Sequence, residues 1–234
     1  MNILLLMMGG QGLRFRANIP KQYTKIHGRP MFSYIVKKYS TCGNIDGMIL
    51  VSHKDWIPYV EEEMQRAAVC SPFQVIAGGK TRSQSVLNGL VCAATSYPQD
   101  SKLLIHDATH PYVDIEGTRE ILASVGKGKG ATLGALQYDT VYQTDTQGWI
   151  ERVLSRERVV SGASPEAFLL EDLYPIYRNA SPKELEAMTS AGAIALAHKI
   201  PMKVIPSRVL NLKITHPEDM VLFEHLAEGY FFTE

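Results

Sequence analysis

The sequence is poor in cysteine and has no excess of charge of either sign. Its three cysteines, Cys42, Cys70 and Cys92, are far apart and lack the paired spacing of a metal site. A reduced, cytoplasmic chain is the simplest interpretation. The 24 basic and 24 acidic residues cancel. Neither nucleic acid nor an anionic membrane surface is therefore favoured as a partner, and local basic residues are expected to serve local anions.

Long apolar runs are also missing. The first run, 3–8, is too short to cross a membrane and lacks the basic leader of a signal peptide, and no later stretch approaches membrane length. No internal repeat or low-complexity segment is visible. The 234 residues are 45% hydrophobic, which suffices to bury a substantial core. We therefore expect one domain over residues 1–234 and no membrane partner.

What the sequence does have is an informative N-terminal stretch. The apolar run leads into Gly9-Gly10-Gln11-Gly12-Leu13-Arg14-Phe15 and then Pro20-Lys21-Gln22. A short apolar run ending in glycines predicts a buried strand that opens into a tight loop. Glycines let backbone N–H groups approach an anion closely, so this loop suits a triphosphate whose charge Arg14 and Lys21 neutralise. A turn that binds nothing fits this pattern equally well.

Two known phosphate-binding fingerprints are absent from this loop. A P-loop is excluded because no Gly-Lys-Ser/Thr ends it. The dinucleotide fingerprint is excluded because Arg14 and Phe15 stand where its last glycine should follow. What remains is Gly-x-Gly-x-Arg with a basic residue shortly after a proline.

Strand and helix patterns alternate along the chain. Helical spacing over 31–39 precedes a strand over 48–51, and a helix from 53 to about 69 precedes a strand over 73–77. This alternation predicts an α/β fold with a mostly parallel, Rossmann-like sheet flanked by helices, and ligands outside the carboxyl ends of its strands. Two extended runs, 138–143 and 149–153, flank a turn with Gly148 and predict a protruding β-hairpin.

Two further strand ends carry polar groups. Gly78 and Gly79 lead into a helix rich in hydroxyl and amide side chains, and helix N-termini bind anions and nucleotides well. Simple capping by Thr81 or Ser83 is the alternative. The apolar run 102–106 ends in Asp107, whose carboxylate is suited to Mg²⁺ on a triphosphate; a turn or helix cap is again the alternative.

These motifs together resemble one enzyme family. The Gly loop with Pro20-Lys21-Gln22-Tyr23 is similar to that of the cytidylyltransferases that act on methylerythritol phosphate or ribitol phosphate. The stretches 82–85, His106-Asp107, Asp139-Thr140 and Asn211-x-Lys213 agree with that family in the same order. The resemblance spans nearly the whole chain and implies transfer of CMP from CTP to a small polyol phosphate, with release of pyrophosphate.

The resemblance also implies roles for single residues. The catalytic cations would be Arg14, Lys21 and Lys213, and Asp107 would hold Mg²⁺. The hairpin, 138–157, would be the arm of a homodimer that carries Arg156 into the partner's active site. The residues implied to bind CTP are Met8, Gly9, Gly10, Gly12, Gly79, Arg82 and Ser85, and those implied to bind the acceptor phosphate are His110, Thr140, Arg156 and Ser164.

Several positions depart from the family pattern. His110 stands where the family usually has arginine, Ser164-Pro165-Glu166 where it has Thr-Pro-Gln, and Ser190 where an acidic residue commonly follows Thr189. These departures leave room for a different acceptor, or for a nucleotide-binding module without turnover. A glycosyltransferase is the weaker alternative because its Asp-x-Asp motif is not found. Residues 208–215 are expected to form the closing strand before a last helix from Pro217.

Overall fold

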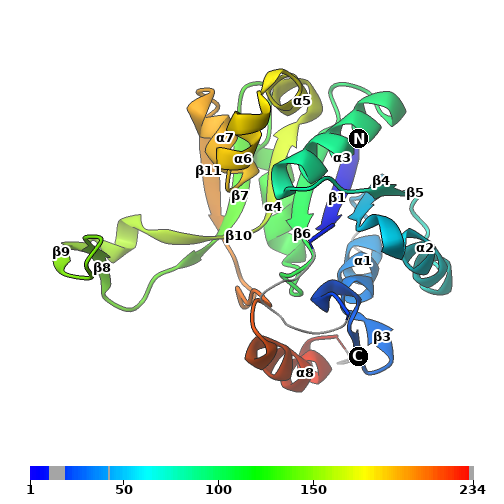
Figure 1. Cartoon of the computed structure of the whole chain (residues 1–234), viewed down its shortest axis with the longest axis horizontal. Coiled ribbons are helices and arrows are strands. Elements are labelled where there is room, and N and C mark those ends of the chain that lie inside the picture. Colours follow the sequence, from blue (N-terminus) through cyan, green and yellow to red (C-terminus); the bar gives the residue numbers. More distant parts are fainter. Residues whose placement is uncertain (11–18, 42, 232–234) are drawn as a thin grey trace.

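The chain folds around a seven-stranded sheet with the strand order β11-β7-β10-β6-β1-β4-β5 (Figure 1). The structure is a computed structural model that describes residues 1–10, 19–41 and 43–231. The strands of this sheet are β1 Asn2–Met8, β4 Gly47–Ser52, β5 Phe73–Ala77, β6 Lys102–Asp107, β7 Gly130–Leu136, β10 Val160–Leu169 and β11 Met202–Pro206.

The sheet is mostly parallel, as predicted. β1 pairs in parallel with β4 on one side and β6 on the other, and β4 with β5 and β7 with β11 are parallel as well. Only β10 runs against its two neighbours, β6 and β7. The parallel strands at the centre therefore end along one edge, where ligands of open α/β sheets bind.

The apolar run of β1 is explained by helices on both faces of the sheet. Leu4, Leu6 and Met8 belong to the core cluster on one face, whereas alternate residues such as Ile3 and Leu5 belong to the cluster on the other. Because both faces are covered, no polar residue alternates with the apolar ones. Residues 3–6 are fully buried.

Two groups of helices cover the sheet (Figure 1). One face packs against α1 Met31–Thr41, α2 Ile57–Arg66 and α4 Ile115–Ser124. The other packs against α3 Arg82–Ser96, α5 Leu170–Asn179, α6 Pro182–Ala187 and α7 Ala191–Ala197. The helix expected from residue 53 begins later, because the chain first makes a 3-10 turn over Lys54–Trp56 and Pro58 lies in the first turn of α2.

The predicted hairpin is a separate two-stranded arm. Its strands, β8 Val141–Thr144 and β9 Ile150–Leu154, pair with each other and join neither of the other sheets. Figure 1 shows the arm projecting away from the body of the molecule. Tyr138 is 79% exposed and Trp149 is 73% exposed. The arm thus presents aromatic surface that the body of its own chain does not cover.

The expected strand over 208–215 is wrong, and the last strand is β11. The segment is irregular because its amides donate to loop and side-chain oxygens: Arg208 N to Asp114 Oδ2 at 2.7 Å and Ile214 N to Thr109 O at 2.8 Å. The last helix, α8 Pro217–Phe231, begins as predicted and packs on a third core cluster around Phe223. No helix in the described part of the chain has the length and apolar content needed to cross a membrane.

One buried histidine belongs to this scaffold. His106 of β6 is fully buried, with Nδ1 2.9 Å from Tyr39 Oη and Nε2 2.8 Å from the carbonyl oxygen of His110. Because a carbonyl only accepts, Nε2 carries the proton and Nδ1 accepts from the tyrosine. Burial lowers the pKa of His106 to about 4, although the hydrogen bond to His110 opposes the shift.

This burial predicts a pH-dependent stability. Between about pH 6.5 and 4 the unfolded chain binds a proton at His106 that the folded chain excludes, so the free energy of unfolding falls as the pH falls. His106→Gln should remove up to about 3 kcal/mol of this loss. Chemical denaturation at pH 4.5 and 7 measures it, with exposed His198→Gln as the control. An unchanged difference between the two pH values in His106→Gln would contradict the assignment.

Candidate functional site

A cavity of about 1020 Å³ lies at the carboxyl edge of the parallel strands. The ends of β1 and β6 and the turns after β4 and β5 border it, as the predicted sheet requires. Nine residues predicted for the site line it: Met8, Gly9, Gly10, Lys21, Gly79, Arg82, Ser85, Asp107 and Lys213. The structure therefore brings together residues from both ends of the chain. Gly12 and Arg14 lie outside the described residues.

The loop after β1 is braced by the residues that follow Lys21. Gln22 Nε2 donates to Met8 O at 2.7 Å and to Gly10 O at 2.8 Å, and Tyr23 Oη lies 3.0 Å from Met8 O. Tyr23 in turn stacks on Trp56, with the ring centroids 4.6 Å apart. These contacts fix the carbonyl groups of Met8 and Gly10 at the cavity wall.

The two predicted catalytic lysines meet at the same cavity. Lys21 lies on the 3-10 turn Lys21–Tyr23, and its Nζ donates to Ile214 O in the segment after β11. That segment also carries Lys213, whose Nζ is 3.8 Å from Asp107 Oδ2. Two positive charges from distant parts of the sequence thus face one cavity, which is suited to a polyanionic ligand.

The second glycine stretch packs directly against the first turn of α3. Ser85 Oγ accepts from Gly79 N at 3.0 Å and donates to Thr81 O at 2.9 Å. A Cβ on Gly78 would lie 2.9 Å from the same hydroxyl. Thr81 caps α3 by accepting from Gln84 N at 3.1 Å, so capping by Thr81 is confirmed. The hydroxyl of Ser85 thus shapes the loop at the cavity wall.

Asp107 is held by the guanidinium of Arg82. Nε and Nη2 of Arg82 lie 3.0 and 2.9 Å from the same oxygen, Asp107 Oδ1. Burial by itself would raise the pKa of Asp107, but Arg82, together with Lys213, outweighs it and holds that pKa below its ordinary value. Burial would likewise lower the pKa of Arg82, and the carboxylates around it raise it instead. Asp107 is therefore an ionised carboxylate near neutral pH.

Glu166 is a site residue that the sequence motifs did not identify as one. It lies on β10, and its Oε2 is 3.8 Å from Arg82 Nη2. Ala191 N donates to Oε2 at 3.1 Å and Gly192 N donates to Oε1 at 2.8 Å. Burial raises the pKa of Glu166, and the charge of Arg82 opposes the shift. The departure from the family's glutamine thus places a second carboxylate beside Arg82.

His110 and Ser164 lie beside Asp107 but are not among the lining residues of the cavity. Ser164 Oγ is 3.2 Å from His110 Nδ1 and accepts from Asp107 N at 3.3 Å. Burial, together with the nearby His106 and Lys213, lowers the pKa of His110 to about 3. The imidazole is therefore neutral near pH 7, so any contact it makes with a phosphate is a hydrogen bond rather than an ion pair.

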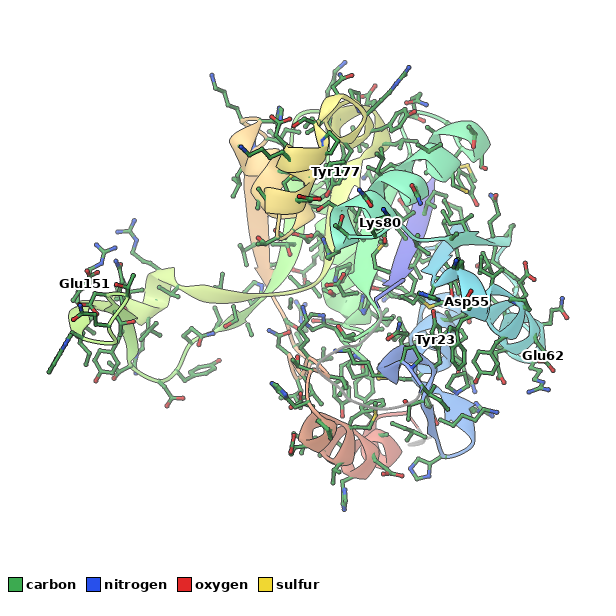
Figure 2. The ribbon with its side chains drawn as sticks, viewed as in Figure 1. Tyr23, Asp55, Glu62, Lys80, Glu151 and Tyr177 are labelled. Carbon is green, nitrogen blue, oxygen red and sulfur yellow. The ribbon has the colours of Figure 1, made fainter. Side chains whose placement is uncertain are left out.

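Thr140 and Arg156 lie on or beside the arm, away from the cavity of their own chain. Arg156 Nη1 donates to Tyr138 O at 2.6 Å at the base of the arm. Figure 2 shows Glu151 of the arm well separated from Lys80, which lines the cavity, and from Tyr23 behind it. Neither predicted residue lines the cavity of its own chain.

The cavity has further lining residues that the motifs missed. Thr109 follows β6, and His53 and Lys54 follow β4. The rule that ligands bind beyond the carboxyl ends of parallel strands would have found them, because the strand over 48–51 was predicted.

The described residues also allow a test of the predicted Mg²⁺ site. They contain no cluster of three or more His, Cys, Asp or Glu side chains fit to hold a metal ion. Asp107 nevertheless fits Mg²⁺ as a single ionised carboxylate, because Mg²⁺ commonly takes one or two carboxylates and completes its shell with water and substrate phosphates.

The fold and the site define an α/β protein of the nucleotidyltransferase type. A family model, IspD: 2-C-methyl-D-erythritol 4-phosphate cytidylyltransferase, matches residues 2–228. The crystal structure of 4-diphosphocytidyl-2C-methyl-D-erythritol synthase from Anaerococcus prevotii superposes with a TM-score of 0.80 at 22% identity, over 97% of this chain and 96% of that one. The chain belongs to the 2-C-methyl-D-erythritol 4-phosphate cytidylyltransferase family, which confirms the resemblance seen in its motifs.

Relatives with two different names match the chain over nearly its full length. The ribitol-5-phosphate cytidylyltransferase of Streptococcus agalactiae is 27% identical over 230 residues, which cover 98% of this chain and 96% of that protein. The 2-C-methyl-D-erythritol 4-phosphate cytidylyltransferase of Thermotoga neapolitana is 29% identical over 232 residues, 98% of each. Overall identity therefore does not distinguish the two acceptors.

The close packing around Gly79 predicts an effect on nucleotide binding. A Cβ at Gly79 would lie 2.4 Å from Gln84 Cβ, so Gly79→Ala must displace the loop or the first turn of α3. Overpacking of this kind costs about 1–3 kcal/mol, and about tenfold weaker binding of CTP is expected from it. Calorimetric titration measures the affinity. Gly126→Ala, where the added Cβ meets open space, is the matched control. Equal affinities in both variants would contradict this account of the loop.

Proposed function

We propose that the protein transfers CMP from CTP to a small polyol phosphate and releases pyrophosphate. One observation carries the proposal: a single cavity of about 1020 Å³ joins two glycine stretches, Lys21, Lys213 and the ionised Asp107. Glycines have no side chain, so phosphates and a nucleoside can approach the backbone closely, and the lysines neutralise the charge of the phosphates. Membership of a cytidylyltransferase family supports the same chemistry.

The nucleotide occupies the wall between the two glycine stretches. The triphosphate lies on the loop that includes Gly9 and Gly10, where Lys21 and Arg14 supply positive charge. The nucleoside lies toward Gly79 and Ser85 at the start of α3, whose N-terminus adds a favourable dipole. Arg82 is part of this wall and is already paired with Asp107.

The reaction needs no covalent enzyme intermediate. An oxygen of the acceptor phosphate attacks the α-phosphorus of CTP and forms a new P–O bond. The bond from the α-phosphorus to the bridging oxygen breaks, and pyrophosphate leaves with that electron pair. Positioning and charge stabilisation by Arg14, Lys21 and Lys213 are the protein's contribution, and one well-placed donor of this kind typically lowers the barrier by about 3 kcal/mol. Mg²⁺ held by Asp107 would neutralise phosphate charge.

The acceptor is a small polyol phosphate, either 2-C-methyl-D-erythritol 4-phosphate or ribitol 5-phosphate. Ser164 and His110 stand beside Asp107, and we assign the acceptor phosphate to this side of the site. Since His110 is neutral near pH 7, the acceptor phosphate depends for charge on Lys213 and on Arg156. Thr140 and Arg156 enter the site from a partner subunit, through the arm.

The arm therefore makes the active form a homodimer. Residues 138–157 form the dimerisation arm of one cytidylyltransferase domain spanning 1–234. Its exposed Tyr138, Trp149 and Val153 supply apolar surface for the contact.

We place the enzyme in the cytoplasm, because Cys70 and Cys92, the cysteines in the described residues, are free thiols.

Pyrophosphate release tests the proposed reaction directly. With CTP and Mg²⁺, we expect release on addition of one of the two acceptors, 2-C-methyl-D-erythritol 4-phosphate or ribitol 5-phosphate, and none with the other nucleoside triphosphates. Lys21→Ala should lower kcat at least about 100-fold, the usual cost of removing one transition-state donor. Lys25→Ala, which removes an exposed lysine paired with Glu63 at 3.6 Å, is the matched control.

Two outcomes would contradict this proposal. CTP binding without release with either acceptor would favour a nucleotide-binding module or another acceptor. An unchanged kcat in Lys21→Ala would remove Lys21 from the chemistry.

Complementation between two inactive variants tests the arm. Lys21→Ala damages the cavity and Arg156→Ala damages the arm, so a mixed dimer keeps one intact site. Mixing the two after partial denaturation should restore activity that neither shows alone, measured as pyrophosphate release. Mixing Lys21→Ala with Lys213→Ala should restore far less. Both changes lie at the cavity, so each cavity of the mixed dimer carries one of them and neither site is intact. Equal recovery in the two mixtures, or none in the first, would refute a site shared between subunits.

A further inference from the structure

The guanidinium of Arg82 lies between two carboxylates, and it is closer to one of them than to the other. Both Nε and Nη2 donate to Asp107 Oδ1, at 3.0 and 2.9 Å, whereas Nη2 is 3.8 Å from Glu166 Oε2. The three side chains come from α3, β6 and β10, which the fold brings to one place. Two carboxyl groups therefore share one cation, and Asp107 Oδ2 is left to face Lys213 at 3.8 Å.

Glu166 is the fixed member of this group. Each of its oxygens accepts a backbone N–H at the start of α7, from Ala191 and Gly192. The approach is so close that a Cβ on Gly192 would lie 2.7 Å from Glu166 Oε1. The side chain of Glu166 is 15% exposed, and that of Arg82, at the cavity wall, is 31% exposed. The longer, more exposed arginine is therefore the member of the group able to shift.

We propose that Glu166 is a positioning residue that receives Arg82 when Asp107 takes up a divalent cation. The inference rests on the proposed function, in which Asp107 holds that cation. A divalent cation at Asp107 competes with the guanidinium for the carboxylate and repels it. Glu166 Oε2 already lies 3.8 Å from Arg82 Nη2. The guanidinium can therefore leave Asp107 and pair with the carboxylate of Glu166 instead. Without that charge, Arg82 remains on Asp107 and opposes cation binding.

The test measures cation binding apart from turnover. Mn²⁺ binding to the full chain is followed by electron paramagnetic resonance with CTP present and no acceptor. Glu166→Gln keeps the size of the side chain and one of the two oxygens that accept from Ala191 N and Gly192 N, but removes the carboxylate. We expect Mn²⁺ to bind about tenfold more weakly, the lower end of the effect that outer partners of a metal ligand usually have.

Two further variants separate this role from a structural one. Ser190→Ala removes the other cap of α7, the hydroxyl that accepts from Ala193 N at 3.0 Å, and leaves Arg82 untouched. It should lower thermal stability without changing Mn²⁺ affinity. Arg82→Gln removes the competing cation, so at saturating CTP, which offsets the lost nucleotide contact, Mn²⁺ should bind at least as well as in the wild type. In the double variant Arg82→Gln, Glu166→Gln, the loss caused by Glu166→Gln should disappear.

Each outcome decides for or against the proposal. If Ser190→Ala weakens Mn²⁺ binding as much as Glu166→Gln does, Glu166 only caps α7. If the effect of Glu166→Gln persists without Arg82, the residue does not act through the guanidinium. Wild-type protein that binds CTP and Mn²⁺ while Glu166→Gln binds them equally well overturns this inference alone; wild-type protein that does not bind CTP overturns the proposed function as well.

Discussion

The parallel register of the central strands is the constraint on which the site depends. Met8 of β1 pairs with Ser52 of β4, Ser52 with Ala77 of β5, and Met7 with Asp107 of β6. Four strands thus stop along one line, and the chain segments that follow them must meet. Alternate side chains of β1 pack in two different core clusters, so a shift of register would remove them from their packing partners, and this packing holds the edge in place.

Electrostatics at this edge are local, in a chain whose total charge is zero. Arg82 and Lys213 surround Asp107 and keep it ionised, and the backbone amides at α7 hold Glu166 beside them. Burial keeps His106 and His110 of the same region neutral near pH 7. The positive charge available to a phosphate therefore comes from lysine and arginine side chains at the cavity, and not from a general surface potential.

Features coded within a few residues could be read from the sequence. The strand ending at Met8, the cap of α3 at Thr81 and the strand ending at Asp107 each combine an apolar run with glycine or polar residues next to it, and all three are confirmed. The parallel sheet follows from the alternation of strand and helix patterns along the chain. The same alternation predicted that residues after the strand ends would meet at one site.

Features that depend on distant contacts could not be read in this way. The role of Glu166 depends on its contacts with Arg82 and Gly192, which are far from it in sequence. The antiparallel strand β10 brings Glu166 to these residues. The segment 208–215 has the composition of a strand, but Asp114 and Thr109 accept its amide hydrogens and no strand forms. The family resemblance marked Glu166 as a departure without indicating its partners.

The central claim is that CTP binds between the two glycine stretches at the carboxyl edge of the sheet. Hydrogen exchange of the backbone amides, with and without CTP and Mg²⁺, tests it most directly, since it maps binding without requiring turnover. The account predicts slower exchange in residues 8–10 and 78–85, most of which line the cavity. Unchanged exchange in both segments at saturating CTP, or protection confined to another face of the sheet, would contradict it.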